Sequence, residues 1–291
     1  MADTLIWTGT TDGNWGTDTN FSPAQVPITG DTVIMENNAV AVTGTLDQSA
    51  VTLAALIIKQ SYTGTIGTAA TYLQIGATLV DIGEHYGYGT PLGSQRIMLD
   101  FGTVASTINI HNTCTTSADS GRAPVRIKIV EATSDIFIRK GTVGIGANIH
   151  GDLSTVDEIH VGFVDSKASD ATVVIGASVT LDELQMTGGE VTLQCAATTV
   201  GVIDGTLYTE GSGAITTMTV EGGTVYANSS GAITTLNAKG GTVDFTKSSE
   251  DRTVTTTDYW VGAKIKWDPT YITLTNDPEP QEAGVLTCAA L

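Results

Sequence analysis

The sequence has few basic residues and no long apolar run. Lys and Arg number 13 against 31 Asp and Glu in 291 residues, which gives a formal net charge of −18. Contacts from Lys and Arg to phosphate supply most of the affinity for nucleic acid, so the sequence predicts no nucleic-acid partner. The longest apolar run, residues 53–58, is strand-length, whereas a membrane helix needs roughly 18 apolar residues. We therefore expect no membrane contact either.

Cysteine is also scarce. Separately, no segment of the sequence shows the periodicity of an amphipathic helix. The three cysteines, Cys114, Cys195 and Cys288, are odd in number and widely spaced, which fits neither a disulfide framework nor a zinc site. We interpret them as thiols kept in a reducing compartment. The first residues lack the basic and apolar regions of a signal peptide, so we expect synthesis in a reducing cytoplasm.

What the sequence has in abundance is glycine, 33 residues, and threonine, 49 residues. With valine and isoleucine, this composition favours short strands joined by tight turns. Two consecutive blocks, 213–230 and 231–248, align without gaps and share ten identical residues. Block 195–212 fits the same register more weakly. Repeats of this length are typical of solenoids, in which each unit packs only on its neighbours.

Alternation within the blocks predicts which side chains face inward. Stacking the blocks places Val200, Met218 and Leu236 in one column, and Leu207, Val225 and Val243 in another. We therefore predict an all-β fold, a parallel β-helix (β-solenoid), and favour a right-handed coil. An antiparallel sandwich of similar hairpins is the alternative, but sandwich strands need not repeat side chains in register.

The chain divides into four regions on this interpretation. Residues 1–50 form an N-terminal cap, 51–140 irregular rungs with loop insertions, 141–250 regular rungs, and 251–291 a C-terminal cap and tail. Tryptophan is confined to the two ends, and one loop in the irregular region carries two tyrosines. Since terminal units must shield open strand edges, we expect aromatic-rich caps. The predicted interface residues are Trp7, Trp15, Tyr86, Tyr88, Trp260 and Trp267. A sugar-binding aromatic platform is the alternative.

A search for catalytic groups finds one candidate pattern. Asp157-Glu158 and Asp182-Glu183 are expected to stack on neighbouring rungs, where two carboxylates suit glycoside hydrolysis or Ca²⁺. Adjacent strand residues face opposite sides, however, so each pair should offer one carboxylate per face. The histidines form no HExxH or HxH pattern, and no GxSxG or phosphate-binding loop is present. We therefore predict no catalytic residue, cofactor or metal ligand.

The opening segment carries a resemblance to a known class of proteins. Trp7-x-Gly9, Asp12-Gly13-x-Trp15, Asn20-Phe21-Ser22, Val26-Pro27 and Gly30-Asp31-Thr32-Val33 follow one another within about 35 residues. This pattern resembles the start of β-helical passenger regions of bacterial surface proteins and of many bacteriophage virion proteins. The absent signal peptide favours the phage side.

The resemblance implies a non-enzymatic virion structural protein, most simply one that decorates or cements the capsid. It implies the major capsid protein as partner, a homotrimer, and a place on the capsid surface. A solenoid with net charge −18 is compatible with this role, because copies repel one another in solution. Two alternatives stay open: a tail fibre or tailspike adhesin, and a polysaccharide-degrading β-helix enzyme that uses Asp182 or Glu183.

Overall fold

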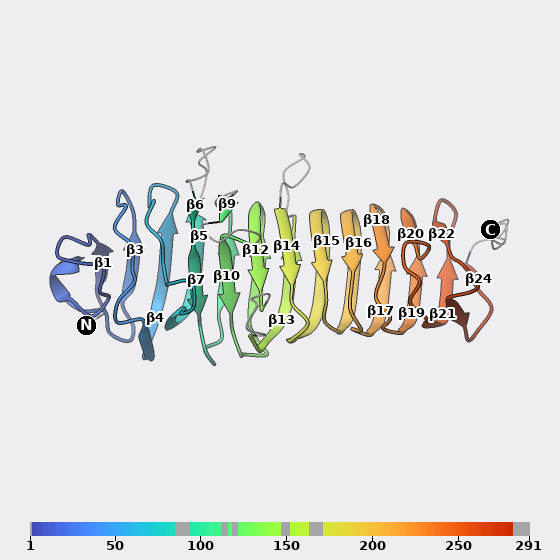
Figure 1. Ribbon diagram of the computed structural model, residues 1–291, viewed down its shortest axis with the longest axis horizontal. Helices are drawn as coiled ribbons and strands as arrows, with labels where there is room; N and C mark the ends of the chain where they lie inside the picture. The colour runs from blue at the N-terminus through green and yellow to red at the C-terminus, as the bar shows by residue number, and fades with distance from the viewer. Residues whose placement is uncertain are drawn as a thin grey trace.

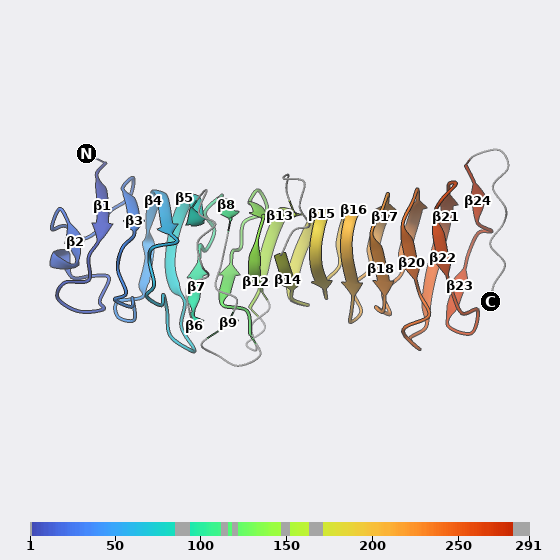
Figure 2. The same cartoon turned by 90° about the horizontal axis from the view of Figure 1, so that it is seen from above.

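The computed structural model describes residues 2–84, 94–111, 116–117, 122–146, 152–162 and 171–281. The chain coils into a long, narrow body in which strands stack one behind another along the long axis, and the two termini lie at opposite ends (Figures 1 and 2). Within these residues every pairing between strands is parallel except the one between β1 and β2. In the described part of the chain the only helical turn is η1, a 3₁₀ turn at Asp18–Asn20.

One row of strands runs the whole length of the body, each hydrogen-bonded to the next coil. We call it the first row. Its members are β1 (Thr4–Trp7), β3 (Thr32–Met35), β4 (Asp47–Lys59), β5 (Leu73–Glu84), β8 (Thr107–Ile110), β11 (Asp135–Ile138), β13 (Ser154–Val161), β15 (Val179–Leu193), β16 (Ala197–Thr209), β17 (Ile215–Val220), β19 (Ile233–Ala238), β21 (Arg252–Tyr259) and β24 (Glu279–Pro280).

A second row begins at the first residues of β4, which pair with the start of β5, and continues to the C-terminal end. β15 and β16 are long enough to bend and contribute to both rows. The other members are β7 (Ile97–Asp100), β10 (Val125–Lys128), β12 (Gly141–Ile145), β14 (Ala171–Ile175), β18 (Thr224–Ala227), β20 (Thr242–Asp244) and β22 (Lys264–Lys266). β23 (Ile272–Leu274) pairs with the start of β21 and so belongs to the first row beside β24. Outside the rows lie β2 (Phe21–Ser22) and the small pair β6 (Ser94–Gln95) with β9 (Thr116–Ser117).

The register of the two rows confirms the predicted columns. Val200 pairs with Met218 and Met218 with Leu236, while Leu207, Val225 and Val243 align in the second row. All six side chains are buried, with exposed fractions of 1% or less. Burying apolar side chains stabilises the fold by roughly 25 cal/mol per Å². Because each coil covers the next, one hydrophobic core runs along the body.

Glycines form the corners between the two rows. Gly223 and Gly241 both have φ near +64°, a conformation that side chains disfavour. A Cβ on Gly223 would lie 2.5 Å from the Gly205 carbonyl oxygen of the preceding coil. Glycine therefore recurs at this corner because the backbones of adjacent coils approach too closely for any side chain.

The N-terminal end of the core is sealed by the opening segment. Trp7, Trp15 and Phe21 pack together with ring centroids 5.2 to 6.1 Å apart, and the exposed fraction of each is 3% or less. Asn20, fully buried, accepts the backbone N–H groups of Thr11 and Asp12 at 2.9 and 3.1 Å. The motif residues of this segment thus form a packed aromatic and hydrogen-bonded closure.

The C-terminal end is built differently. Ile265, Trp267 and Leu274 pack against the core but are only partly buried. Within the described residues β22 pairs with β20 alone, and β23 and β24 pair with β21 alone, so each has one unpaired edge. The two ends of the core are therefore unequal, one sealed and one open.

The structure confirms the all-β prediction and the parallel, solenoid-like stacking. The sandwich alternative is wrong, because in-register parallel pairing joins neighbouring coils instead of antiparallel hairpins. The hand of the coil and the four regional boundaries stay predictions. The loop insertions predicted from the sequence at residues 84–95 and 112–124, and the cysteines Cys114 and Cys288, lie for the most part outside the described residues.

Candidate functional site

A column of carboxylates lies on the outward face of the first row in its middle coils. Asp135 on β11 aligns with Glu158 on β13, which aligns with Glu183 on β15. The apolar neighbours Ile136, Ile159 and Leu184 are fully buried and point into the core, so alternation turns the acidic side chains outward. Adjacent strands in a sheet lie about 4.8 Å apart, which sets the spacing of the column.

A second outward column runs two residues further along the same strands. It contains Phe137, His160 and Gln185 in register. His160 Nε2 lies 2.8 Å from Glu158 Oε2, and the Gln185 amide donates to Glu183 Oε1 at 2.6 Å. The Phe137 and His160 rings stack with centroids 4.9 Å apart and planes 11° from parallel. Two of the three carboxylates are therefore held by a neighbour on their own strand.

Asp135, at one end of the column, titrates in a partly buried and negatively charged environment. The pKa of Asp135 is raised above its ordinary value by partial burial first and then by the negative charges of Glu158 and Asp157, while His160 opposes the rise. An arrangement of carboxylates in unlike environments is one that acid–base chemistry uses.

One detail of the sequence prediction was wrong. Adjacent carboxylates were expected on opposite faces of the strand, but Asp157 and Glu158 are both solvent-accessible, as are Asp182 and Glu183. The strand bends between them, so that two consecutive side chains face outward before alternation resumes at Ile159 and Leu184. The acidic surface is therefore denser than alternation alone implies.

The geometry of the column sets what it can do chemically. Neighbouring carboxylates at the coil spacing come near the roughly 5 Å separation used by retaining glycosidases. The stacked Phe137 and His160 rings, however, lie face to face along the column, so they do not present a shared flat surface to a sugar. Among the described residues, no group of three or more His, Cys, Asp or Glu side chains is arranged to hold a metal ion.

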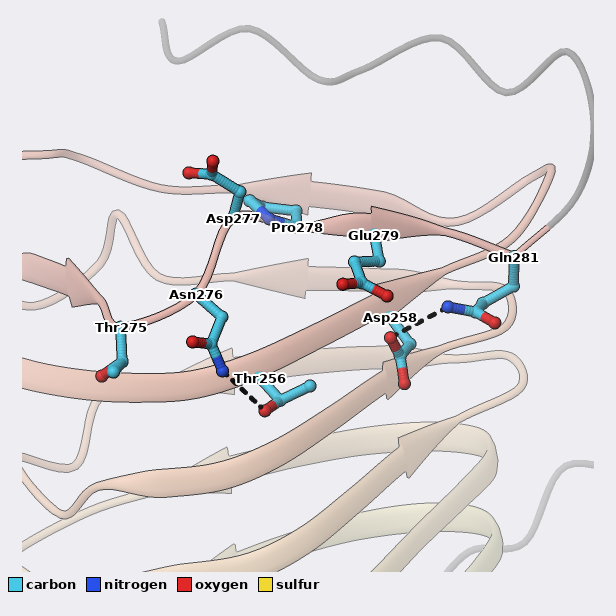
Figure 3. A pocket seen from close by; sticks show the side chains of 8 residues that line it. All are labelled: Thr256, Asp258, Thr275, Asn276, Asp277, Pro278, Glu279 and Gln281. Carbon is cyan, nitrogen blue, oxygen red and sulfur yellow. Dashed lines mark hydrogen bonds between the residues drawn. The ribbon is translucent and has the colours of Figure 1, made fainter.

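A polar groove of about 780 Å³ lies at the C-terminal end of the first row (Figure 3). It lies between β21 and the segment that leads into β24, and Asp258, Asp277 and Glu279 supply three carboxylates. The Asn276 amide donates to Thr256 Oγ1 at 3.3 Å, and the Gln281 amide donates to Asp258 Oδ1 at 3.0 Å. These hydrogen bonds tie the last segment to the body and leave an acidic, open surface.

The predicted interface residues separate into three groups. Trp7 and Trp15 have no exposed surface, and the structure therefore places them in the core and not on the surface. Trp260 and Trp267 are half-buried near the open end. Tyr86 and Tyr88 lie outside the described residues.

The sequence analysis missed a surface feature at the other end of the first row. Ile6, Ile34 and Ile57 align in register on β1, β3 and β4, at the outward positions between buried neighbours, and all three are partly exposed. In the next coil Leu79 is 37% exposed one column away. We call this set the aliphatic stripe. In the sequence, this stripe is marked by strands that are apolar at both their inward and their outward positions.

Comparison with known proteins returned no match from protein-family models, from curated proteins or from solved structures. Within the described residues, no helix has the length and apolar character needed to cross a membrane.

Proposed function

We propose that this chain is a non-enzymatic structural protein of a bacteriophage virion, which decorates or cements the capsid by binding the major capsid protein. The proposal rests on the resemblance of the opening segment and on the character of the outer surface. A protein of this kind needs a rigid body, a solvated surface and a contact patch, and it needs no reaction centre.

The aliphatic stripe is the observation that carries the proposal. Three successive coils carry partly exposed isoleucines, whereas the same column further along is mostly polar, with Phe137 and Gly201 as the exceptions. Contiguous exposed apolar side chains bordered by polar ones mark sites of protein contact. We assign this stripe to the contact with the shell protein. The homotrimer implied by the resemblance is addressed by no contact in the structure, and the mass of the purified chain distinguishes it from the two-chain association inferred below.

Binding to isolated shells tests the proposal. Shells of the producing phage, stripped of this chain, are mixed with purified protein and sedimented. We expect saturable binding at a high copy number, and we expect Ile34→Asp to abolish it, because a charge in the stripe has to be desolvated on contact. Thr235→Asp, at an outward position far along the same row, is the matched control. Binding that Ile34→Asp leaves unchanged, or binding of a few copies at the tail, contradicts the proposal.

The carboxylate column favours one second candidate, hydrolysis of an acidic or neutral polysaccharide. Its support is the spacing of Glu158 and Glu183 and the raised pKa of Asp135. The test is release of reducing ends from host capsule or lipopolysaccharide. Activity that disappears in Glu158→Gln and Glu183→Gln, with folding intact, would establish this candidate and remove the non-enzymatic proposal.

A further inference from the structure

The C-terminal end of the body has the composition of a contact surface. Its centre is apolar, because Ile265, Trp267 and Leu274 belong to the last coil and no described strand covers them. A central apolar patch surrounded by polar side chains is the usual anatomy of a protein interface. We call this surface the end face.

The rim of the end face carries opposite charges on its two sides. On the second row, Lys264 and Lys266 are exposed at outward positions of β22. On the first row, Asp277 and Glu279 are exposed around β24. Lys266 is anchored by an ion pair with Asp244 at 3.2 Å. The basic side and the acidic side therefore flank the same apolar centre.

This distribution of charge is complementary to itself. When two end faces meet about a twofold axis that exchanges the two rows, the basic side of each lies against the acidic side of the other. A partner with a uniform charge gains no such match. We propose that the end face binds the end face of a second copy of this chain, so that two bodies join end to end.

The opposite end of the molecule explains why such association stops at two copies. Trp7, Trp15 and Phe21 fill the N-terminal end of the core, and β2 pairs antiparallel with β1 across its edge. A head-to-tail contact, which generates open filaments, lacks a matching surface there. The lysines on β22 and Pro280 on β24 also oppose indiscriminate pairing of strand edges. The charges around the end face and the packed aromatic side chains at the other end therefore favour a pair of chains over an open filament.

Sedimentation of the purified full chain tests this inference independently of any virion. We expect the mass of two chains at micromolar concentration, and we expect dissociation to increase with salt because the rim charges are solvent-exposed. A mass of one chain or of three chains overturns the inference. Since the aliphatic stripe lies at the other end, loss of shell binding in Ile34→Asp leaves the two-chain mass unchanged.

A charge exchange gives the sharper test. Lys264→Glu and Glu279→Lys each place like charges across the interface, and each should weaken association on the order of tenfold. The double variant restores the pairing of opposite charges and should recover most of the affinity. Lys140→Glu, which makes the same change of charge in the middle of the body, is the matched control. Failure of the double variant to recover affinity contradicts the twofold arrangement.

Removal of residues 282–291 distinguishes two occupants of the end face: a second copy of the chain, and the last residues of the same chain. We expect the shortened chain to retain the two-chain mass. If the full chain has the mass of one chain and the shortened chain pairs, the tail is the occupant and the inference is wrong.

Discussion

At the scale of single residues, buried polar groups hold the opening segment in place. Asn20 and Asp31 are both fully buried in the opening segment. Asp31 accepts the backbone N–H groups of Asp3 and Ile28 at 2.8 and 2.9 Å. These are motif residues of the resemblance, and their contacts show that this part of the motif holds together a folded end of the core.

Asn20→Ala tests this reading of the motif. The substitution leaves the Thr11 and Asp12 amides without an acceptor, and also removes the bond from the Asn20 amide to Asn14 O at 2.8 Å. Each buried polar group left unpaired costs about 1 to 3 kcal/mol, so we expect a loss of about 3 kcal/mol. Urea unfolding followed by tryptophan fluorescence measures it. Asn237→Ala, which removes one half-buried bond to Thr219, should cost far less.

The carboxylate column predicts an unusual dependence of stability on pH. The folded-state pKa of Asp135 is raised, so the folded protein binds this proton more tightly than the unfolded chain, and stability decreases as pH rises above 3.8. Asp135→Asn should therefore increase the free energy of unfolding at pH 7, by less than about 1 kcal/mol after solvent screening, and leave it unchanged near pH 3. Unfolding at both pH values checks the sign.

Asp244 provides a comparison of opposite sign. Burial tends to raise its pKa, but hydrogen bonds from Thr246 and Lys266 outweigh burial and lower it. Its contribution is present above pH 3.8 and is lost as pH falls through the lower folded-state pKa. Asp244→Asn should therefore destabilise the protein at pH 7 and have little effect at the acidic end. Equal effects of both substitutions at pH 7 would contradict the electrostatic account.

At the scale of elements, each coil restricts which residue types the next coil can carry on its strands and at its corners. Outward positions accept Thr, Asn, Asp or Glu, whereas inward positions are filled by aliphatic residues at each level. The corners accept only glycine where backbones approach, as at Gly223 and Gly241. This dependence on the neighbouring coil is the reason that blocks 213–230 and 231–248 remain similar.

Gly223→Ala tests the corner. Its Cβ would meet the Gly205 carbonyl at 2.5 Å and φ is +64°, whereas at Gly102, with φ of +58°, nothing lies within 4 Å. We expect Gly102→Ala to cost about 1 kcal/mol, from backbone strain alone. In Gly223→Ala the new Cβ also has to push the two coils apart, so we expect this variant to lose about 3 kcal/mol or more of its free energy of unfolding. Thermal unfolding of the two variants gives the difference, and equal costs would show that close approach is irrelevant.

At the scale of the whole molecule, the body is a one-dimensional stack with one sealed end and one open end. Contacts join each coil to its two neighbours, so stability grows by addition of coils. The same geometry separates the proposed activities: the aliphatic stripe lies on the first coils, the carboxylate column on the middle ones and the end face on the last (Figure 1).

Deletion of one complete coil tests the additive stack. Removing residues 213–230 brings Val200 against Leu236 and Leu207 against Val243, which preserves every inward column. We expect a folded β protein with an unfolding transition that is somewhat lower but still cooperative. Removing only residues 222–230 shifts the later strands out of register and should abolish the transition. Circular dichroism and calorimetry distinguish the two outcomes.

The sequence by itself determined the class of fold and the columns of the core. Alternation and gapless repetition identify which side chains face inward, because the coil imposes one register on every block. It also marked Trp7 and Trp15 as part of an end structure, since tryptophan is absent from the regular blocks.

Only the tertiary structure decided what lies outside the core. The repeat in the sequence predicted that Glu158 stacks on Glu183, but the place of Asp135 in the same column depends on the register between β11 and β13, which the sequence did not indicate. The aliphatic stripe and the two rims of the end face are likewise formed by residues from different coils. A local pattern identifies the face on which a side chain lies, whereas its neighbours across coils are set by how the whole chain stacks.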